Sequence, residues 1–121
     1  LGKPMIQHVF EKAEKFPYWN NLILTTCDKE IKNFAKKNSI PNIMTSKKHK
    51  RCLDRVYEAA KKTRGIKNND IIVCVQGDEP MLEPKMISNV LKPILKRKVN
   101  CTVLAMDIIH KEQFLNKDYT C

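Results

Sequence analysis

Residues 70–80 constrain the fold of this chain most, because an apolar run there leads directly into polar turn residues. Residues 71–75 are apolar and mostly β-branched, which predicts a strand buried on both faces of a parallel sheet. Such sheets bind ligands beyond the carboxyl ends of their strands, so Asp78 and Glu79 are candidates for chemistry. The alternative interpretation of residues 77–80 is a polar turn that leads into the next helix.

Helical and strand patterns alternate along the rest of the chain. Helical spacing of apolar residues predicts helices at 4–16, 28–39, 53–65, 86–95 and 110–114. Short apolar runs predict further strands at 22–25, 41–45 and 102–109. We expect Pro93 to kink or divide its helix. The alternation predicts an α/β fold with three layers, a mostly parallel sheet and right-handed crossovers, and no linker divides the expected single domain, residues 1–121.

The formal net charge of +10 raises the question of a polyanionic partner. The lysines are spread over every predicted helix and loop, including the basic loop 46–51, which is typical of solvated faces rather than one nucleic-acid patch. We therefore expect no nucleic-acid partner, whereas a nucleotide triphosphate or an acidic sugar would benefit from the same field. No apolar run approaches membrane-spanning length, so no membrane partner is expected.

Five cysteines occur in the sequence without any Cys-x-x-Cys pair. Metal binding through sulfur is therefore not expected. An odd number of cysteines without a disulfide framework suits a reducing compartment, which predicts a cytoplasmic location.

Three segments carry a resemblance to a known family. They read GKPMI at residues 2–6, MTS at 44–46 followed by His49 and Asp54-Arg55, and VQGDEP at 75–80. In this order and spacing they resemble the 3-deoxy-manno-octulosonate (KDO) cytidylyltransferase family, also called CMP-KDO synthetases. The resemblance runs from the first residue to about residue 109, and VQGDEP is its most specific part.

The resemblance implies a nucleotide-diphospho-sugar transferase fold, which is Rossmann-like, with residues 1–121 as a partial cytidylyltransferase domain. It also implies that CTP and KDO give CMP-KDO and pyrophosphate, a step of lipopolysaccharide or cell-wall sugar activation. The anomeric hydroxyl of the sugar would attack the α-phosphorus of CTP in line, while Mg²⁺ offsets the phosphate charge. Members of the family commonly form dimers, so a homodimer is implied as well.

The same resemblance assigns roles to individual residues. Asp78 matches the metal-binding aspartate and is the expected catalytic residue and Mg²⁺ ligand. Gln76 would lie against the nucleotide or sugar, with an amide bonded to backbone as the alternative. His49 and Arg55 would border the nucleotide and sugar-acid pocket, where a cation suits a carboxylate or phosphate, although His49 also fits an exposed loop histidine. Glu79 is expected to be structural.

The chain departs from the family pattern at Cys52 and Leu53, which replace a small glycine and a hydroxyl residue. We expect their side chains to fill space beside the nucleotide. The family's triphosphate-binding loop and a second metal-binding acid have no counterpart in these residues, so we expect a central fragment with little or no activity by itself. The alternatives are a cytidylyltransferase for another sugar acid, a non-catalytic remnant of the fold and, last, a basic nucleic-acid binder.

Overall fold

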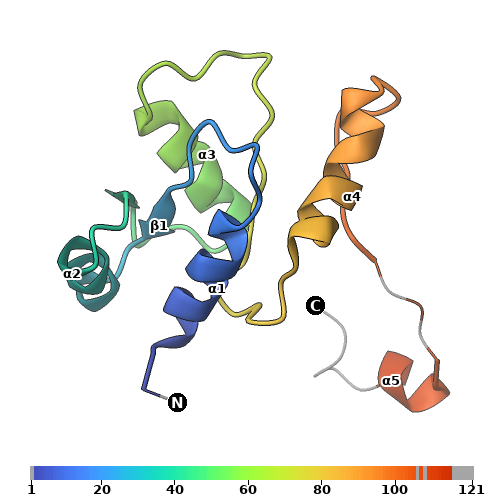
Figure 1. Ribbon diagram of the computed structural model, residues 1–121, viewed down its shortest axis with the longest axis horizontal. Helices are drawn as coiled ribbons and strands as arrows, with labels where there is room; N and C mark the ends of the chain where they lie inside the picture. Colours follow the sequence, from blue (N-terminus) through green and yellow to red (C-terminus); the bar gives the residue numbers. More distant parts are fainter. Residues whose placement is uncertain (1, 106, 108, 116–121) are drawn as a thin grey trace. The chain divides into compact units, whose positions relative to one another are not determined.

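Helices and strands alternate at the start of the chain, as the sequence pattern predicts, and helices follow (Figure 1). The computed structural model describes residues 2–105, 107 and 109–115. Its elements are α1 (Met5–Glu14), β1 (Leu24–Thr26), α2 (Lys29–Lys37), β2 (Asn42–Met44), α3 (Cys52–Lys62), α4 (Pro84–Leu95) and α5 (Lys111–Leu115). Each described helix is too short or too polar to cross a bilayer.

The contacts divide the chain into two compact units, Leu1–Ile87 and Ser88–Cys121. The first unit holds α1, both strands, α2, α3 and the start of α4. No Gly/Ser-rich linker marks this division in the sequence. The candidate site residues all belong to the first unit.

A parallel pair of strands forms the centre of the first unit. Leu24 lies opposite Asn42 and Thr26 lies opposite Met44, with α2 as the crossover between the strands. Leu24 packs with the fully buried Ala35 of α2 and with Ile40, and residues of α1 cover this cluster. The predicted α/β fold class with parallel strands is therefore confirmed.

Local polar contacts set the two ends of α2. At its start the Asp28 carboxylate accepts hydrogen bonds from the backbone N–H groups of Glu30 (2.6 Å) and Ile31 (3.3 Å). These bonds satisfy donors that the first turn of a helix leaves open. At its end Ser39 adopts φ +56°, and the Ile40 N–H donates to the Ala35 carbonyl over 2.8 Å. The left-handed residue stops the helix and turns the chain into β2.

Aromatic packing closes the end of α1. Val9 and Ala13 are the buried residues of this helix, and Phe16 follows them into the interior. The rings of Phe16 and Trp19 meet edge to face, with their centroids 5.0 Å apart. Trp19 Nε1 donates to the Ala13 carbonyl over 2.8 Å. The indole thus satisfies a carbonyl at the last turn of the helix while it covers the core.

The predicted strand at 71–75 is wrong, because these residues form no β-ladder in the described structure. A parallel strand needs hydrogen-bonded neighbours along its edges, and the sheet in the described residues contains β1 and β2. Ile71 and Ile72 remain 40% and 46% exposed as a result. The described residues of the predicted strand 102–109 form no strand either, and positions 106 and 108 lie outside the described residues.

Of the two expected effects of Pro93, a kink or a division of its helix, the division is wrong. α4 runs without interruption from Pro84 to Leu95 with Pro93 inside it. Pro93 has no N–H for the carbonyl four residues before it, and α4 ends two residues after it, so little of the helix lies beyond the lost hydrogen bond. The helix closes just beyond it, where Lys98 N–H donates to the Pro93 carbonyl (3.1 Å) and Arg97 adopts φ +53°.

Candidate functional site

Two buried threonines mark the carboxyl ends of the paired strands. Thr45 follows β2, and both its N–H (2.9 Å) and its hydroxyl (3.2 Å) donate to the carbonyl of Thr26, the last residue of β1. Arg55 of α3 donates through Nη1 to the Thr45 hydroxyl over 2.7 Å. These contacts place the Arg55 guanidinium at the edge of the sheet where parallel strands present their ligands.

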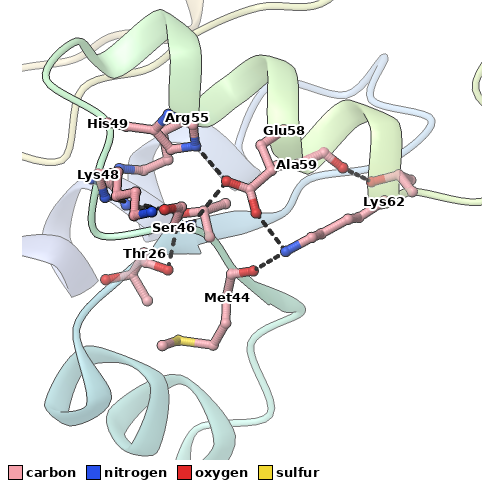
Figure 2. Close-up of polar contacts among 11 residues, drawn as sticks. Thr26, Met44, Ser46, Lys48, His49, Arg55, Glu58, Ala59 and Lys62 are labelled. Atoms are coloured by element: carbon pink, nitrogen blue, oxygen red, sulfur yellow. Dashed lines mark hydrogen bonds and ion pairs between the residues drawn. The ribbon is translucent and has the colours of Figure 1, made fainter.

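The Glu58 carboxylate links the loop after β2 to α3 (Figure 2). Its carboxylate accepts hydrogen bonds from the Ser46 N–H (2.9 Å), from His49 Nε2 and from Lys62 Nζ (2.6 Å). Lys62 Nζ also donates to the Met44 carbonyl over 2.9 Å. One carboxylate therefore joins the end of β2, the basic loop and two turns of α3.

The surroundings of Glu58 favour its charged form. The Lys62 ammonium, the Ser46 backbone N–H and His49 lower the pKa of the Glu58 carboxyl from 4.5 to about 2. Each of these groups donates to the carboxylate and stabilises the negative charge. Glu58 is consequently ionised across the physiological pH range and offsets part of the positive charge of the 46–51 loop.

Two of the predicted site residues, His49 and Arg55, are brought together at this sheet edge. The structure holds each through a partner that the motif did not indicate: Glu58 for His49 and Thr45 for Arg55. Arg55 uses one of its N–H groups on Thr45, and a guanidinium has five such groups. The arrangement can therefore fix the guanidinium plane and still offer donors to an anion.

The remaining predicted residues lie in the turn after the extended segment 71–75. Gln76, Asp78 and Glu79 are exposed, and the Glu79 N–H donates to the Gln76 carbonyl over 3.4 Å. Gly77 lies close to α1, since a Cβ at this position would be 2.8 Å from Ile6 Cδ1. Contact with α1 thus positions the turn that carries Asp78.

The acidic side chains at this turn determine how the expected Mg²⁺ ion could be bound. Within the described residues no three His, Cys, Asp or Glu side chains converge on a common point. Mg²⁺ is commonly held by one or two carboxylates together with substrate phosphates and water. The single exposed carboxylate of Asp78 therefore fits an ion that is also bound by the phosphates of a triphosphate. It does not fit an ion whose ligands all come from the protein.

Sequence reasoning missed Glu58, Lys62 and Thr45. Glu58 and Lys62 are four residues apart on α3, a spacing that signals a helical ion pair and could have been noticed. Nothing local in the sequence links Glu58 to Ser46 or His49. Thr45 belongs to the recognised MTS segment, but its burial follows from the pairing of β1 with β2.

Cys52 and Leu53 occupy the first turn of α3, and both side chains are exposed. Whether they border a nucleotide stays a prediction. A separate shallow hollow of about 350 Å³ lies beside Phe10, Trp19 and Pro41 and includes none of the predicted site residues.

Comparisons with known proteins agree with the recognised motifs. A family model described as cytidylyltransferase matches residues 1–119. A 3-deoxy-manno-octulosonate cytidylyltransferase of Actinobacillus pleuropneumoniae serotype 7 is 39% identical over 115 residues, which cover 95% of this chain and 45% of the relative. The corresponding protein of Nitratidesulfovibrio vulgaris strain DP4 is 34% identical over 112 residues, with 93% of this chain and 44% of the relative covered.

A solved structure shares the fold. CMP:2-keto-3-deoxy-manno-octonic acid synthetase complexed with CTP superposes with a TM-score of 0.71 and 31% identity, covering 79% of this chain and 38% of that one. The chain thus spans less than half the length of these proteins. With the family model matched along residues 1–119, the chain belongs to the cytidylyltransferase family.

Proposed function

We propose that this chain is part of a CTP-dependent cytidylyltransferase that converts CTP and KDO into CMP-KDO and pyrophosphate. The match to the family model along residues 1–119 carries the proposal. Relatives that are 34–39% identical act, by their names, on 3-deoxy-manno-octulosonate, and a solved structure of similar fold is a complex with CTP. Because the chain spans 44–45% of those relatives, the complete reaction is assigned to the protein as a whole.

Asp78 is the residue that would hold Mg²⁺ in this reaction. Mg²⁺ would neutralise charge on the triphosphate and so favour departure of pyrophosphate. Asp78 has an exposed carboxylate on a turn that Gly77 brings against α1. Asp78 would supply negatively charged oxygen atoms to the ion. Gln76 on the same turn can donate hydrogen bonds to the nucleotide or sugar and accept them.

His49 and Arg55 would bind the anionic groups of the substrates. Arg55 is oriented by the Thr45 hydroxyl, and the imidazole of His49 is held by Glu58. A planar guanidinium that is already oriented loses little freedom when it binds a carboxylate or phosphate. Both residues therefore act by binding and orientation rather than by proton transfer.

The setting of the reaction follows from the same proposal. CMP-KDO would feed lipopolysaccharide or cell-wall synthesis, and the protein would act in the cytoplasm as a homodimer. The four described cysteines are free, which is consistent with a reducing compartment.

A different sugar acid is the second candidate. Cys52 and Leu53 stand at the start of α3 where the family usually has smaller or hydroxylated residues. Leu53 is 63% exposed, so the helix that carries Arg55 presents an apolar side chain to solvent in its first turn. These two replacements are the feature that leaves a different sugar acid open as a substrate.

The metal role of Asp78 is tested in the whole protein to which this chain is proposed to belong. We expect Asp78→Asn to lower Mg²⁺-dependent pyrophosphate release by about 10²-fold or more, because several kcal/mol of charge stabilisation is lost. Glu79→Gln is the matched control on the same turn and should retain activity. Unchanged turnover in Asp78→Asn would contradict the metal role.

The substrate is tested by measuring pyrophosphate release from CTP with KDO and with a sialic-like acid. Release that depends on KDO supports the proposed function. Release with the other acid alone favours the second candidate. If the whole protein to which this chain is proposed to belong neither binds CTP nor releases pyrophosphate with either acid, it is a non-catalytic remnant of the fold.

A further inference from the structure

One face of α3 holds the segment that follows β2. Arg55, Glu58 and Lys62 are three and four residues apart, so their side chains leave the helix on the same side. Their partners are three successive residues (Figure 2): Thr45 for Arg55 (2.7 Å), Ser46 for Glu58 (2.9 Å) and Met44 for Lys62 (2.9 Å). The place of this segment is therefore set by α3 as well as by the pairing of the strands.

Glu58 is the residue of this face that also reaches His49. Its Oε2 atom accepts hydrogen bonds from the Ser46 N–H and from His49 Nε2, while Oε1 accepts from Lys62 Nζ (2.6 Å). Within the turn, the Lys48 N–H donates to Ser46 Oγ over 3.1 Å. The side chains of Glu58 and His49 are each 23% exposed. One carboxylate thus holds both ends of the turn 46–49 in a place that is largely shielded from water.

The contact with Glu58 decides which nitrogen of His49 is available to a ligand. An ionised carboxylate can only accept hydrogen bonds, so His49 Nε2 carries a proton. Nδ1 is the other ring nitrogen. It accepts from a hydroxyl while the ring is neutral, and it donates to a carboxylate or phosphate when the ring is protonated. A ligand therefore meets His49 at Nδ1 in either state.

We propose that Glu58 is a positioning residue for substrate binding, which holds the imidazole of His49 and the turn 46–49 so that His49 Nδ1 binds the substrate. The identity of the substrate rests on the proposed function, which this inference deepens. Glu58 acts through His49, since both of its carboxylate oxygens accept hydrogen bonds from within the chain. An imidazole that is already oriented loses little freedom when the substrate binds.

The kinetic test uses the whole protein to which this chain is proposed to belong, and it compares Glu58→Gln, His49→Ala and the double variant. Glu58→Gln keeps the size of the side chain, but it removes the charge and turns N–H groups towards the donors that Glu58 binds. We expect both single variants to raise the KM for the same substrate, CTP or KDO, by about 10-fold, with kcat changed by less than about 2-fold. In the double variant this KM should be no higher than in His49→Ala, because Glu58 acts through His49.

A purely structural role for Glu58 gives a different kinetic result. Losses that add in the double variant, or unchanged KM values in Glu58→Gln, would overturn the proposal. Glu30→Gln is the matched control, because Glu30 is an exposed acid of α2 outside the Glu58 cluster. It should leave both KM values unchanged.

A second measurement on the same protein needs no substrate. We expect NMR of the ¹⁵N-labelled protein to show the proton on His49 Nε2, because its hydrogen bond slows exchange with water. His49→Ala identifies this signal. In Glu58→Gln the signal should disappear, and the Ser46 amide should exchange at least about 10-fold faster.

The NMR result separates the positioning contact from the proposed function. Absence of the Nε2 signal from the native protein, or its persistence in Glu58→Gln with unchanged exchange at Ser46, would overturn the positioning role. A native protein without KDO-dependent pyrophosphate release would instead contradict the proposed function, and the NMR measurement would then decide by itself whether Glu58 positions His49.

Discussion

Glu58 shows how one carboxylate can organise a binding edge without touching a ligand. Its three donors come from the loop after β2 and from α3, and together they keep it ionised. Its side chain is 23% exposed, so water screens part of these interactions. The residue is therefore best regarded as a positioning residue for His49.

The contribution of Glu58 to the free energy of unfolding should depend on pH. A carboxyl whose pKa is lower in the folded chain stabilises the fold above its unfolded pKa, 4.5, and this contribution disappears as pH falls through about 2. We expect the difference in unfolding free energy between the native chain and Glu58→Gln to be largest above pH 4.5 and to shrink towards pH 2. Urea unfolding at stepwise pH measures this difference.

A control substitution separates this effect from general acid unfolding. Glu30→Gln changes an exposed acid of α2 that is not part of the Glu58 cluster. The unfolding free energy of Glu30→Gln should stay much closer to that of the native chain across the same pH range. A pH-independent difference between the native chain and Glu58→Gln would contradict the role assigned to the Lys62 and Ser46 contacts.

Among the elements, α2 depends on its N-cap residue, Asp28, for a defined start. Asp28→Ala removes the acceptor for two backbone N–H groups and should lower the free energy of unfolding by about 1 kcal/mol. Asp28→Asn keeps a capping oxygen and should lose much less. Thermal melts followed by circular dichroism would measure both variants, and equal stability of Asp28→Ala and the native chain would exclude a capping role.

The elements also separate what the sequence could predict from what it could not. The patterns around Val9, Leu24 and Ala35 depend on local periodicity, and the predicted helices and first two strands formed close to their expected positions. Residues 71–75 have an equally strong strand pattern but form no strand, because pairing depends on neighbours that a local pattern does not contain. His49 and Arg55 were found through motifs, whereas their partners Glu58 and Thr45 followed from tertiary contacts.

At the scale of the whole molecule, hydrogen bonding within the chain is unevenly distributed. The Leu24 N–H donates to Pro41 and the Thr45 N–H donates to Thr26, both over 2.9 Å. Residues 71–75 have the extended, apolar character of a strand without the ladder. The first unit therefore combines a hydrogen-bonded pair of strands with an apolar segment that is partly exposed.

Hydrogen exchange followed by NMR should reveal this contrast. We expect the amides of Leu24 and Thr45 to exchange at least about 100-fold more slowly, relative to their intrinsic rates, than those of Ile72 and Val73. The amides within α2 are an internal reference for hydrogen-bonded backbone. Similar protection at Ile72 and Leu24 would mean that residues 71–75 are paired in solution.

The packing of Trp19 on Phe16 and on the end of α1 has a spectroscopic consequence. The sequence contains one tryptophan, so indole fluorescence arises from a single place in the Leu1–Ile87 unit. Helical ellipticity, by contrast, sums over α1, α2 and α3 and over α4 and α5 as well. Melting the chain by both signals therefore compares one unit with the whole molecule, and coincident transitions would identify the two units as a single cooperative system.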